Sequence, residues 1–134
     1  MIDQLCQQID SHESYHNDYE ALSQSSSLML LRNNISINAD SVIRLLKSAT
    51  IFALSDKEEY RKQAYSIAVM TWNILSYFEE TVRKEIEAII VIVFSRLGNF
   101  PAEKKFIDEV SFDEGFLPPT LQLERQYHIG ANKF

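Results

Sequence analysis

The stretch from Arg83 to Ala102 constrains the fold more than any other part of the chain. Its apolar residues recur at steps of three and four, the spacing of one helix face, and they are Ile86, Ile89, Ile90, Val93, Phe94 and Leu97. Val91 and Ile92 lie off this face, so the helix must be enclosed, either by the chain itself or by a partner. Gly98 can turn left-handed at the helix end, and Pro101 opposes an immediate restart. We therefore expect a central helix followed by a structural turn made of Leu97, Gly98, Asn99, Phe100, Pro101 and Ala102.

Helical periodicity continues through most of the chain before residue 111. We expect a serine-rich break at 23–27, after which 28–31 form a short helical cluster. Asn38 is suited to cap the next helix, and Ser55 to Glu58 has the S-x-x-E form of a capping box. The expected helices span about 2–22, 39–54, 56–78, 79–97 and 102–110.

Composition agrees with a helical fold. The chain has 134 residues, of which 46% are hydrophobic, and only 3 are glycine and 3 proline. Such a chain can bury one sizeable core and has few of the turn formers that β-proteins need. We predict an all-α, compact bundle of about five helices in residues 1–110. Residues 111–134 contain two adjacent prolines and alternating leucines, which predict an extended tail or linker towards a missing downstream region.

Charge and cysteine content limit the cellular location and the binding partners that we expect. The formal net charge of −6 disfavours direct binding to a phosphate backbone, so nucleic acid is expected only through a parent protein. Seven basic residues could gather at one end of the bundle, although nearby acids favour ordinary surface charges, and they are Lys57, Arg61, Lys62, Arg83, Lys84, Lys104 and Lys105. The single Cys6 fits a reducing cytoplasm. The sequence has no signal-peptide pattern, and its longest apolar run, Ala88 to Phe94, is too short to span a bilayer.

Two motifs could suggest catalysis. His12 and His16 belong to an H-E-x-x-H sequence, which on a helix can hold zinc. They are weak metal candidates, because the surrounding residues are charged and polar and no supporting third ligand follows. Arg125 to His128 could suggest an Arg/His ribonuclease pair, but it lies between glycines and prolines in the expected tail. The three glycines are isolated, so no phosphate-binding loop is present. We expect no catalytic residue, no cofactor and no enzyme activity in this chain alone.

Three segments carry a family resemblance. The first has matching residues at Ala53, Ser55, Asp56, Glu58, Tyr60 and Arg61. The second is Leu97 to Ala102, LGNFPA, which is the most specific part. The third combines Leu117-Pro118 with Leu121 to Glu124. Together, over about residues 40–134, the chain resembles the N-terminal helical extension of bacterial DEAD/DEAH-box helicases of superfamily two, including those of antiphage defence systems.

The resemblance implies an accessory role without chemistry of its own. The sequence has no G-x-x-x-x-G-K-[ST] and no D-E-x-[DH] motif, so the chain cannot hydrolyse ATP alone. It would dock on the helicase core or on a partner protein subunit, and we expect Val91, Ile92, Phe116 and Leu117 to take part. A stand-alone adaptor of a multi-subunit system remains an alternative. A small helical metal hydrolase or ribonuclease is the third, and the site residues argue against it.

Overall fold

The structure, a computed structural model, describes residues 2–30 and 37–131. Within these residues all regular structure is helical, with seven α-helices, two short 3-10 segments and no strand. The elements are α1 (Ile2–Asp10), α2 (Glu13–Leu30), α3 (Ala39–Phe52), α4 (Glu58–Asn73), η1 (Leu75–Tyr77), α5 (Glu80–Leu97), α6 (Phe100–Val110), η2 (Glu114–Phe116) and α7 (Pro119–Ala131). The all-α class is confirmed, but the expected number of about five helices is too low.

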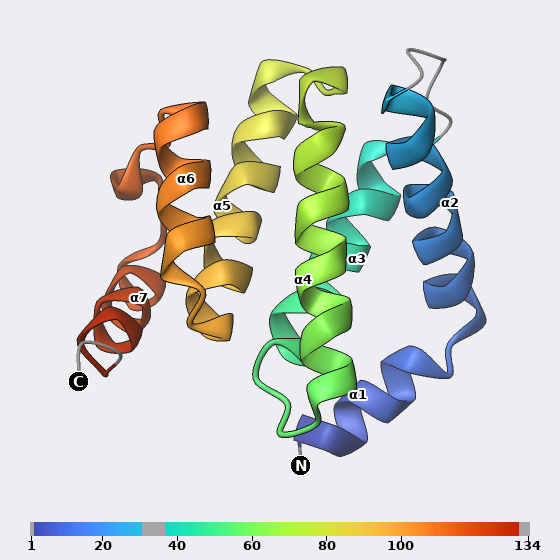
Figure 1. Ribbon diagram of the computed structural model, residues 1–134, viewed down its shortest axis with the longest axis horizontal. Helices are drawn as coiled ribbons and strands as arrows, with labels where there is room; N and C mark the ends of the chain where they lie inside the picture. Colours follow the sequence, from blue (N-terminus) through green and yellow to red (C-terminus); the bar gives the residue numbers. More distant parts are fainter. Residues whose placement is uncertain (1, 31–36, 132–134) are drawn as a thin grey trace.

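Helix α5 is the centre of the bundle. It packs against α3, α4, α6 and α7, so four helices share its surface. In Figure 1, α1 and α2 lie on one side of α3 and α4, while α6 and α7 lie on the side of α5 away from α2. The position of α5 follows from its composition, because a helix that is apolar nearly all round is stable only when neighbours cover every side.

The turn after α5 adopts the geometry that its sequence favours. Gly98 has a φ of 70°, in the left-handed region, and its N–H donates to Ser95 O at 3.0 Å. The Asn99 N–H donates to Phe94 O at 3.1 Å, which satisfies another carbonyl at the end of α5. The Asn99 side chain then accepts from the Ala102 N–H at 3.3 Å and so caps α6. One helix therefore ends and the next begins within this turn.

Pro101 has a different role from the one expected. It lies in the first turn of α6, which begins at Phe100 rather than at Ala102. Proline is tolerated there because the first N–H groups of a helix have no partner within that helix. The expectation that Pro101 delays the next helix is wrong.

The N-terminal part of the chain differs from the expected pattern. The single helix expected over 2–22 is two helices, separated at Ser11-His12. The expected serine-rich break lies inside α2, where Ser25 and Ser26 are buried. Helices tolerate such serines when packing supports them, because propensity is a weak preference. The cluster expected at 28–31 is the end of α2 as far as Leu30, and residue 31 lies outside the described part.

One of the two expected N-terminal caps is present. The Asn38 side chain accepts from the Ser41 N–H at 2.9 Å, as predicted for the start of α3. The capping box at Ser55 does not form, because Lys57 is the N-cap of α4 and makes no side-chain cap bond. The Ser55 hydroxyl instead donates to the Asp3 carboxylate of α1 and accepts from the Lys57 N–H at 3.1 Å. A tertiary contact has replaced the local one.

The largest correction concerns the C-terminal segment. Residues Pro119–Ala131 form α7, where the sequence predicted an extended tail. Pro119 is the first residue of this helix, a position that needs no N–H donor. Helix α7 packs against α5, to which the pair of Arg96 with Glu124 joins it, and a second pair, Arg125 with Glu103, joins it to α6. The packing of α7 therefore depends on charged residues that hydrophobic periodicity does not detect.

Candidate functional site

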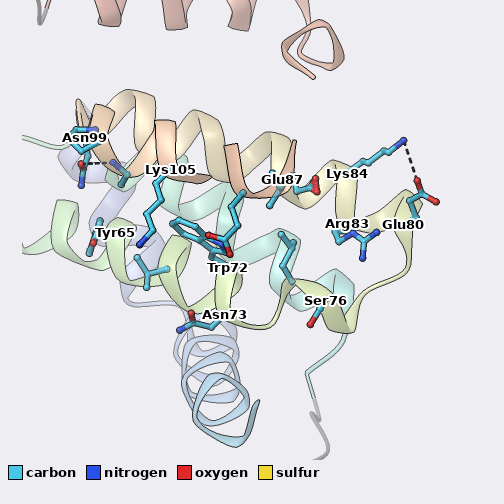
Figure 2. Close-up of a pocket in the computed structure, with 16 residues that line it drawn as sticks. Tyr65, Trp72, Asn73, Ser76, Glu80, Arg83, Lys84, Glu87, Asn99 and Lys105 are labelled. Carbon is cyan, nitrogen blue, oxygen red and sulfur yellow. Dashed lines mark hydrogen bonds and ion pairs between the residues drawn. The ribbon is translucent and has the colours of Figure 1, made fainter. Parts of the chain in front are cut away.

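A groove of about 1070 Å³ lies between α4, α5 and α6. Helices α4 and α6 each pack against α5, and the groove follows α5 between them. Figure 2 shows Tyr65 and Asn99 at one end of the groove and Ser76 and Arg83 at the other. Residues 65–76 span about 16 Å at the helical rise of roughly 1.5 Å per residue. The groove is therefore about three helical turns long.

One wall of the groove is held in place by aromatic packing. Trp72 meets Phe106 of α6 edge to face, with ring centres 5.0 Å apart, and Phe94 of α5 at 6.2 Å. Tyr65 lies 6.2 Å from the same Phe94 ring, and 44% of its surface is exposed. Contacts of this kind favour defined ring orientations. The groove therefore offers a fixed aromatic surface to anything that enters it.

Charges of both signs line the groove. Arg83, Lys84 and Lys105 are the basic residues, and Glu80, Glu87 and Glu109 are the acidic ones. In Figure 2, Trp72 reaches in from α4 and Lys105 extends across from α6. Lys84 and Glu80 form an ion pair at 3.7 Å, but both side chains are mostly exposed, so the pair adds little stability. The groove has no single sign of charge.

Glu87 stands apart from the other charged residues of the groove. Only 7% of its surface is exposed, although carboxylates are rarely so buried unless they are paired. Among the described residues, its carboxylate has neither a hydrogen bond nor an ion pair. Burial raises the pKa of Glu87, while the charges of Arg83 and Lys84 act in the opposite direction. The Glu87 carboxylate thus borders the open groove without a protein partner among the described residues.

The turn that carries the most specific part of the resemblance borders this groove. Asn99, Pro101 and Ala102 all line it. Their positions depend on the Asn99 cap and on the left-handed Gly98, as described above. The sequence predicted a structural turn here, and the structure adds that the turn forms one end of the groove.

The residues expected to contact a partner have very different exposures. Val91 is fully buried, Ile92 is 7% exposed and Leu117 is 2% exposed. The chain itself encloses Val91 and Ile92, which corresponds to the first of the two arrangements considered for the central helix. Phe116 is 53% exposed and remains accessible. Helix α7 also has exposed apolar side chains, Leu123 at 66% and Tyr127 at 72%.

The described side chains of the two motifs that could suggest catalysis do not form an assembled site. His12 precedes α2 and lies 2.8 Å, Nδ1 to Oγ, from Ser14, while His16 lies within α2, and both histidines are exposed. No group of three or more His, Cys, Asp or Glu side chains that could hold a metal occurs in the described part of the chain. Arg125 is engaged with Glu103, and the side chain of His128 lies outside the described residues.

The basic residues do not gather at one end of the bundle. Lys57 and Lys62 are at the start of α4, whereas Arg83 and Lys84 are at the start of α5. The two helices run antiparallel, so these pairs of residues lie at opposite ends of the bundle (Figure 1). Several are engaged locally, as in the pair of Lys62 with Glu58 at 3.7 Å. These residues are therefore spread over the bundle, although Arg83, Lys84 and Lys105 all line the groove.

Comparison with known proteins does not assign the chain to a family. No family model, no curated protein and no solved structure matches this chain. Separately, none of the helices in residues 2–30 and 37–131 has the length and apolar character that crossing a bilayer requires. Function is therefore inferred from the chemistry of the groove and from the residues that carry the resemblance.

Sequence reasoning did not find the groove. Its lining residues come from four elements, and their periodicities show only which faces are apolar. One signal was present in the sequence, namely Glu87 directly before the apolar run Ala88 to Phe94 of α5. A carboxylate at such a position needs a partner or a solvent-filled space beside it.

Proposed function

We propose that this chain is a non-catalytic helical accessory domain that docks on the motor of a DEAD/DEAH-box helicase of the antiphage-defence type. The observation that carries the proposal is the position of the LGNFPA turn. Its residues are the most specific part of the resemblance, and Asn99, Pro101 and Ala102 line the groove between α4, α5 and α6. A family-like segment at the edge of a groove supports recognition of a partner there.

The dimensions of the groove favour a protein segment over a small substrate. Small-molecule pockets usually enclose about 300–1,000 Å³ and bury most of their ligand. This groove has a volume of about 1070 Å³ and is open along α5. It also presents acids, bases and partly exposed aromatic residues together, which is a composition that suits protein interfaces.

In this proposal the domain acts in the cytoplasm and contacts nucleic acid only through the motor. Its net charge of −6 would repel a phosphate backbone, whereas the motor supplies the nucleic-acid path. The domain therefore contributes binding and orientation, and the motor contributes ATP hydrolysis.

The first test is genetic and the second is biochemical. The reading frame that follows codon 134 is expected to continue into a phosphate-binding G-K-T motif. The motor encoded there, expressed separately, is expected to bind residues 1–134 in an equimolar complex. Calorimetry of the two purified proteins measures the affinity. A frame that closes without such a motif, or an encoded motor that does not bind residues 1–134, would overturn the proposal.

Charge reversal then locates the contact. Lys105→Glu changes the groove, and Lys47→Glu makes the same change on an exposed position of α3 away from it. Like charges across an interface cost several kcal/mol, so Lys105→Glu is expected to weaken binding at least about tenfold. Lys47→Glu should stay within about twofold of the parent protein. Equal effects of the two variants would show that the motor does not use the groove.

A stand-alone adaptor is the second candidate, because the chain has another exposed surface. An adaptor needs two contact surfaces, and Phe116, Leu123 and Tyr127 provide exposed apolar groups at a distance in sequence from the groove. Replacing Leu123 by Ser is expected to remove one partner of an adaptor without affecting the partner at the groove. Loss of both partners in Leu123→Ser would contradict this assignment.

A further inference from the structure

The strongest remaining observation is the unpaired carboxylate of Glu87 at the groove. Glu87 is 7% exposed and lines the groove, and no described residue forms a hydrogen bond or an ion pair with it. Its carboxylate oxygens are not among the fully buried side-chain atoms without a partner, so they can be reached from the groove. A carboxylate that has no protein partner and borders a groove can accept hydrogen bonds from a cationic group that enters the groove.

We infer that the groove receives a helix of the partner protein and that Glu87 binds a lysine or arginine side chain of that helix. This inference rests on the proposed function, since it takes the groove to be the docking site. It adds the chemical identity of the contact. A cationic donor would supply the hydrogen bonds that the carboxylate lacks.

The basic residues on the same helix do not form an ion pair with the Glu87 carboxylate. Lys84 forms its ion pair with Glu80. Arg83 is four residues before Glu87, and a base placed before an acid is the weaker order for such pairs on a helix. The structure shows no ion pair between Arg83 and Glu87 in the described residues. The carboxylate thus remains available on the groove side.

A protein side chain fits this position better than a metal ion does. Hard cations such as calcium take six to eight oxygen ligands, and Glu87 contributes two oxygens at most. No cluster that could hold a metal occurs among the described residues. The neighbouring Trp72 offers an aromatic surface, which attracts ammonium and guanidinium groups. These two features together favour an organic cation.

The remaining groove charges define the rest of the partner helix. Arg83, Lys84 and Lys105 would repel a uniformly basic segment, so the bound helix must carry acids around its single base. The groove spans about three helical turns, or about 16 Å. The expected partner is therefore an amphipathic helix with one central basic residue, flanked by acidic residues and with an apolar face.

The first experiment uses butylguanidinium chloride as the probe and butyrate as a probe of matched size and opposite charge. Trp72 is the single tryptophan of the chain, so its fluorescence reports on the groove. We expect saturable binding of butylguanidinium and no binding of butyrate. Glu87→Gln keeps the shape of the side chain and should weaken butylguanidinium binding at least about tenfold, because a charge-assisted hydrogen bond is lost.

Glu13→Gln is the matched control, because it removes one negative charge from an exposed position in α2. It should leave the affinity for butylguanidinium unchanged. Equal binding by the parent protein and Glu87→Gln would overturn the inference. An equal loss in Glu13→Gln and Glu87→Gln would also overturn it, because that result indicates attraction to net charge alone.

The second experiment identifies the preferred helix. A displayed library of 14-residue helical peptides is selected on the parent protein and, in parallel, on Glu87→Gln. Sequences from the first selection should share a basic residue at one fixed position, and sequences from the second should lack it. Failure to select any peptide, or the same preference in both selections, would contradict the inference. If the helicase motor binds the parent protein and Glu87→Gln with equal affinity, the proposed docking function is retained and the proposed role of Glu87 is rejected.

Discussion

The attachment of α7 gives the most direct test of the structure. Arg125 of α7 donates from Nε to Glu103 of α6 at 2.6 Å, and the two side chains are only 12% and 3% exposed. A second pair, Arg96 with Glu124, joins α5 to α7 at 3.1 Å. The exposed Leu123 and Tyr127 contribute little burial to this contact. We therefore expect the packing of α7 to depend strongly on its charged residues.

The perturbation is Arg125→Met, which keeps the length of the side chain and removes its charge. Breaking a buried ion pair by removing one partner costs about 3–5 kcal/mol. We expect α7 to open before the other helices unfold, because its backbone contacts are mainly with α5, so the cost should appear first as local opening. Since about 1.4 kcal/mol corresponds to a factor of ten, a loss of about 3 kcal/mol would raise amide exchange in α7 about 100-fold.

Hydrogen exchange measured residue by residue is the assay, and Arg44→Met is the control. Arg44 pairs with Asp18 at 3.2 Å, but 59% of the Arg44 side chain is exposed. An exposed pair contributes about 0–1 kcal/mol, so exchange in α2 and α3 should change by less than about tenfold. The double change Glu103→Leu with Arg125→Met should restore most of the protection of α7, because no charge then remains to be desolvated at this pair.

The reasoning would be refuted if Arg125→Met and Arg44→Met had equal effects. It would also be refuted if Arg125→Met left α7 protected but lowered the free energy of unfolding of the whole chain. The second result would mean that α7 is an integral part of the bundle rather than a separately attached helix.

Three further predictions concern the turn, the groove and the thiol. Gly98→Ala should lower the free energy of unfolding by about 1–2 kcal/mol in a urea titration, because a left-handed residue with a Cβ is strained, and Gly98→Asn should cost less. Folding raises the pKa of Glu87, so protonation of Glu87 stabilises the folded protein. This stabilisation is complete below the pKa that Glu87 has in the unfolded chain, and it is lost as the pH rises through the pKa of Glu87 in the folded protein. Glu87→Gln should therefore be more stable than the parent protein at pH 7, and the difference should vanish below about pH 4 in the same titration. Cys6 is fully buried and burial raises its pKa, so iodoacetamide at pH 8 should modify it far more slowly in the folded protein than in urea; equal rates would mean that α1 is detached.

The sequence predicted those elements whose local preferences agree with their packing. Helix α5 combines an apolar pattern with a glycine that can turn left-handed, and both features act within the helix or beside it. The start of α3 was found because the Asn38 cap acts over three residues. Where the stabilising contact is local, a pattern of residues suffices to locate it.

Elements held by distant contacts could not be predicted in the same way. The Ser55 hydroxyl had a local partner available in the capping box but binds Asp3, which is 52 residues away. In α7 the charged side chains of Glu124 and Arg125 are turned towards the bundle, while Leu123 is exposed and Leu121 is only partly buried. A method that assigns apolar residues to the inside therefore finds no helix face here.

The groove illustrates the same limit at the candidate site. Glu87 lies on α5 between apolar residues, where its charge opposes the pattern that makes the helix central. The pattern alone could place this carboxyl group against another helix, where it would be intolerable, or beside open space. Only the packing of α4 and α6 against α5 shows that the space exists. A charged residue that interrupts a buried helix face is therefore a reason to look for a ligand, and at Glu87 the expected ligand is a basic side chain of a partner.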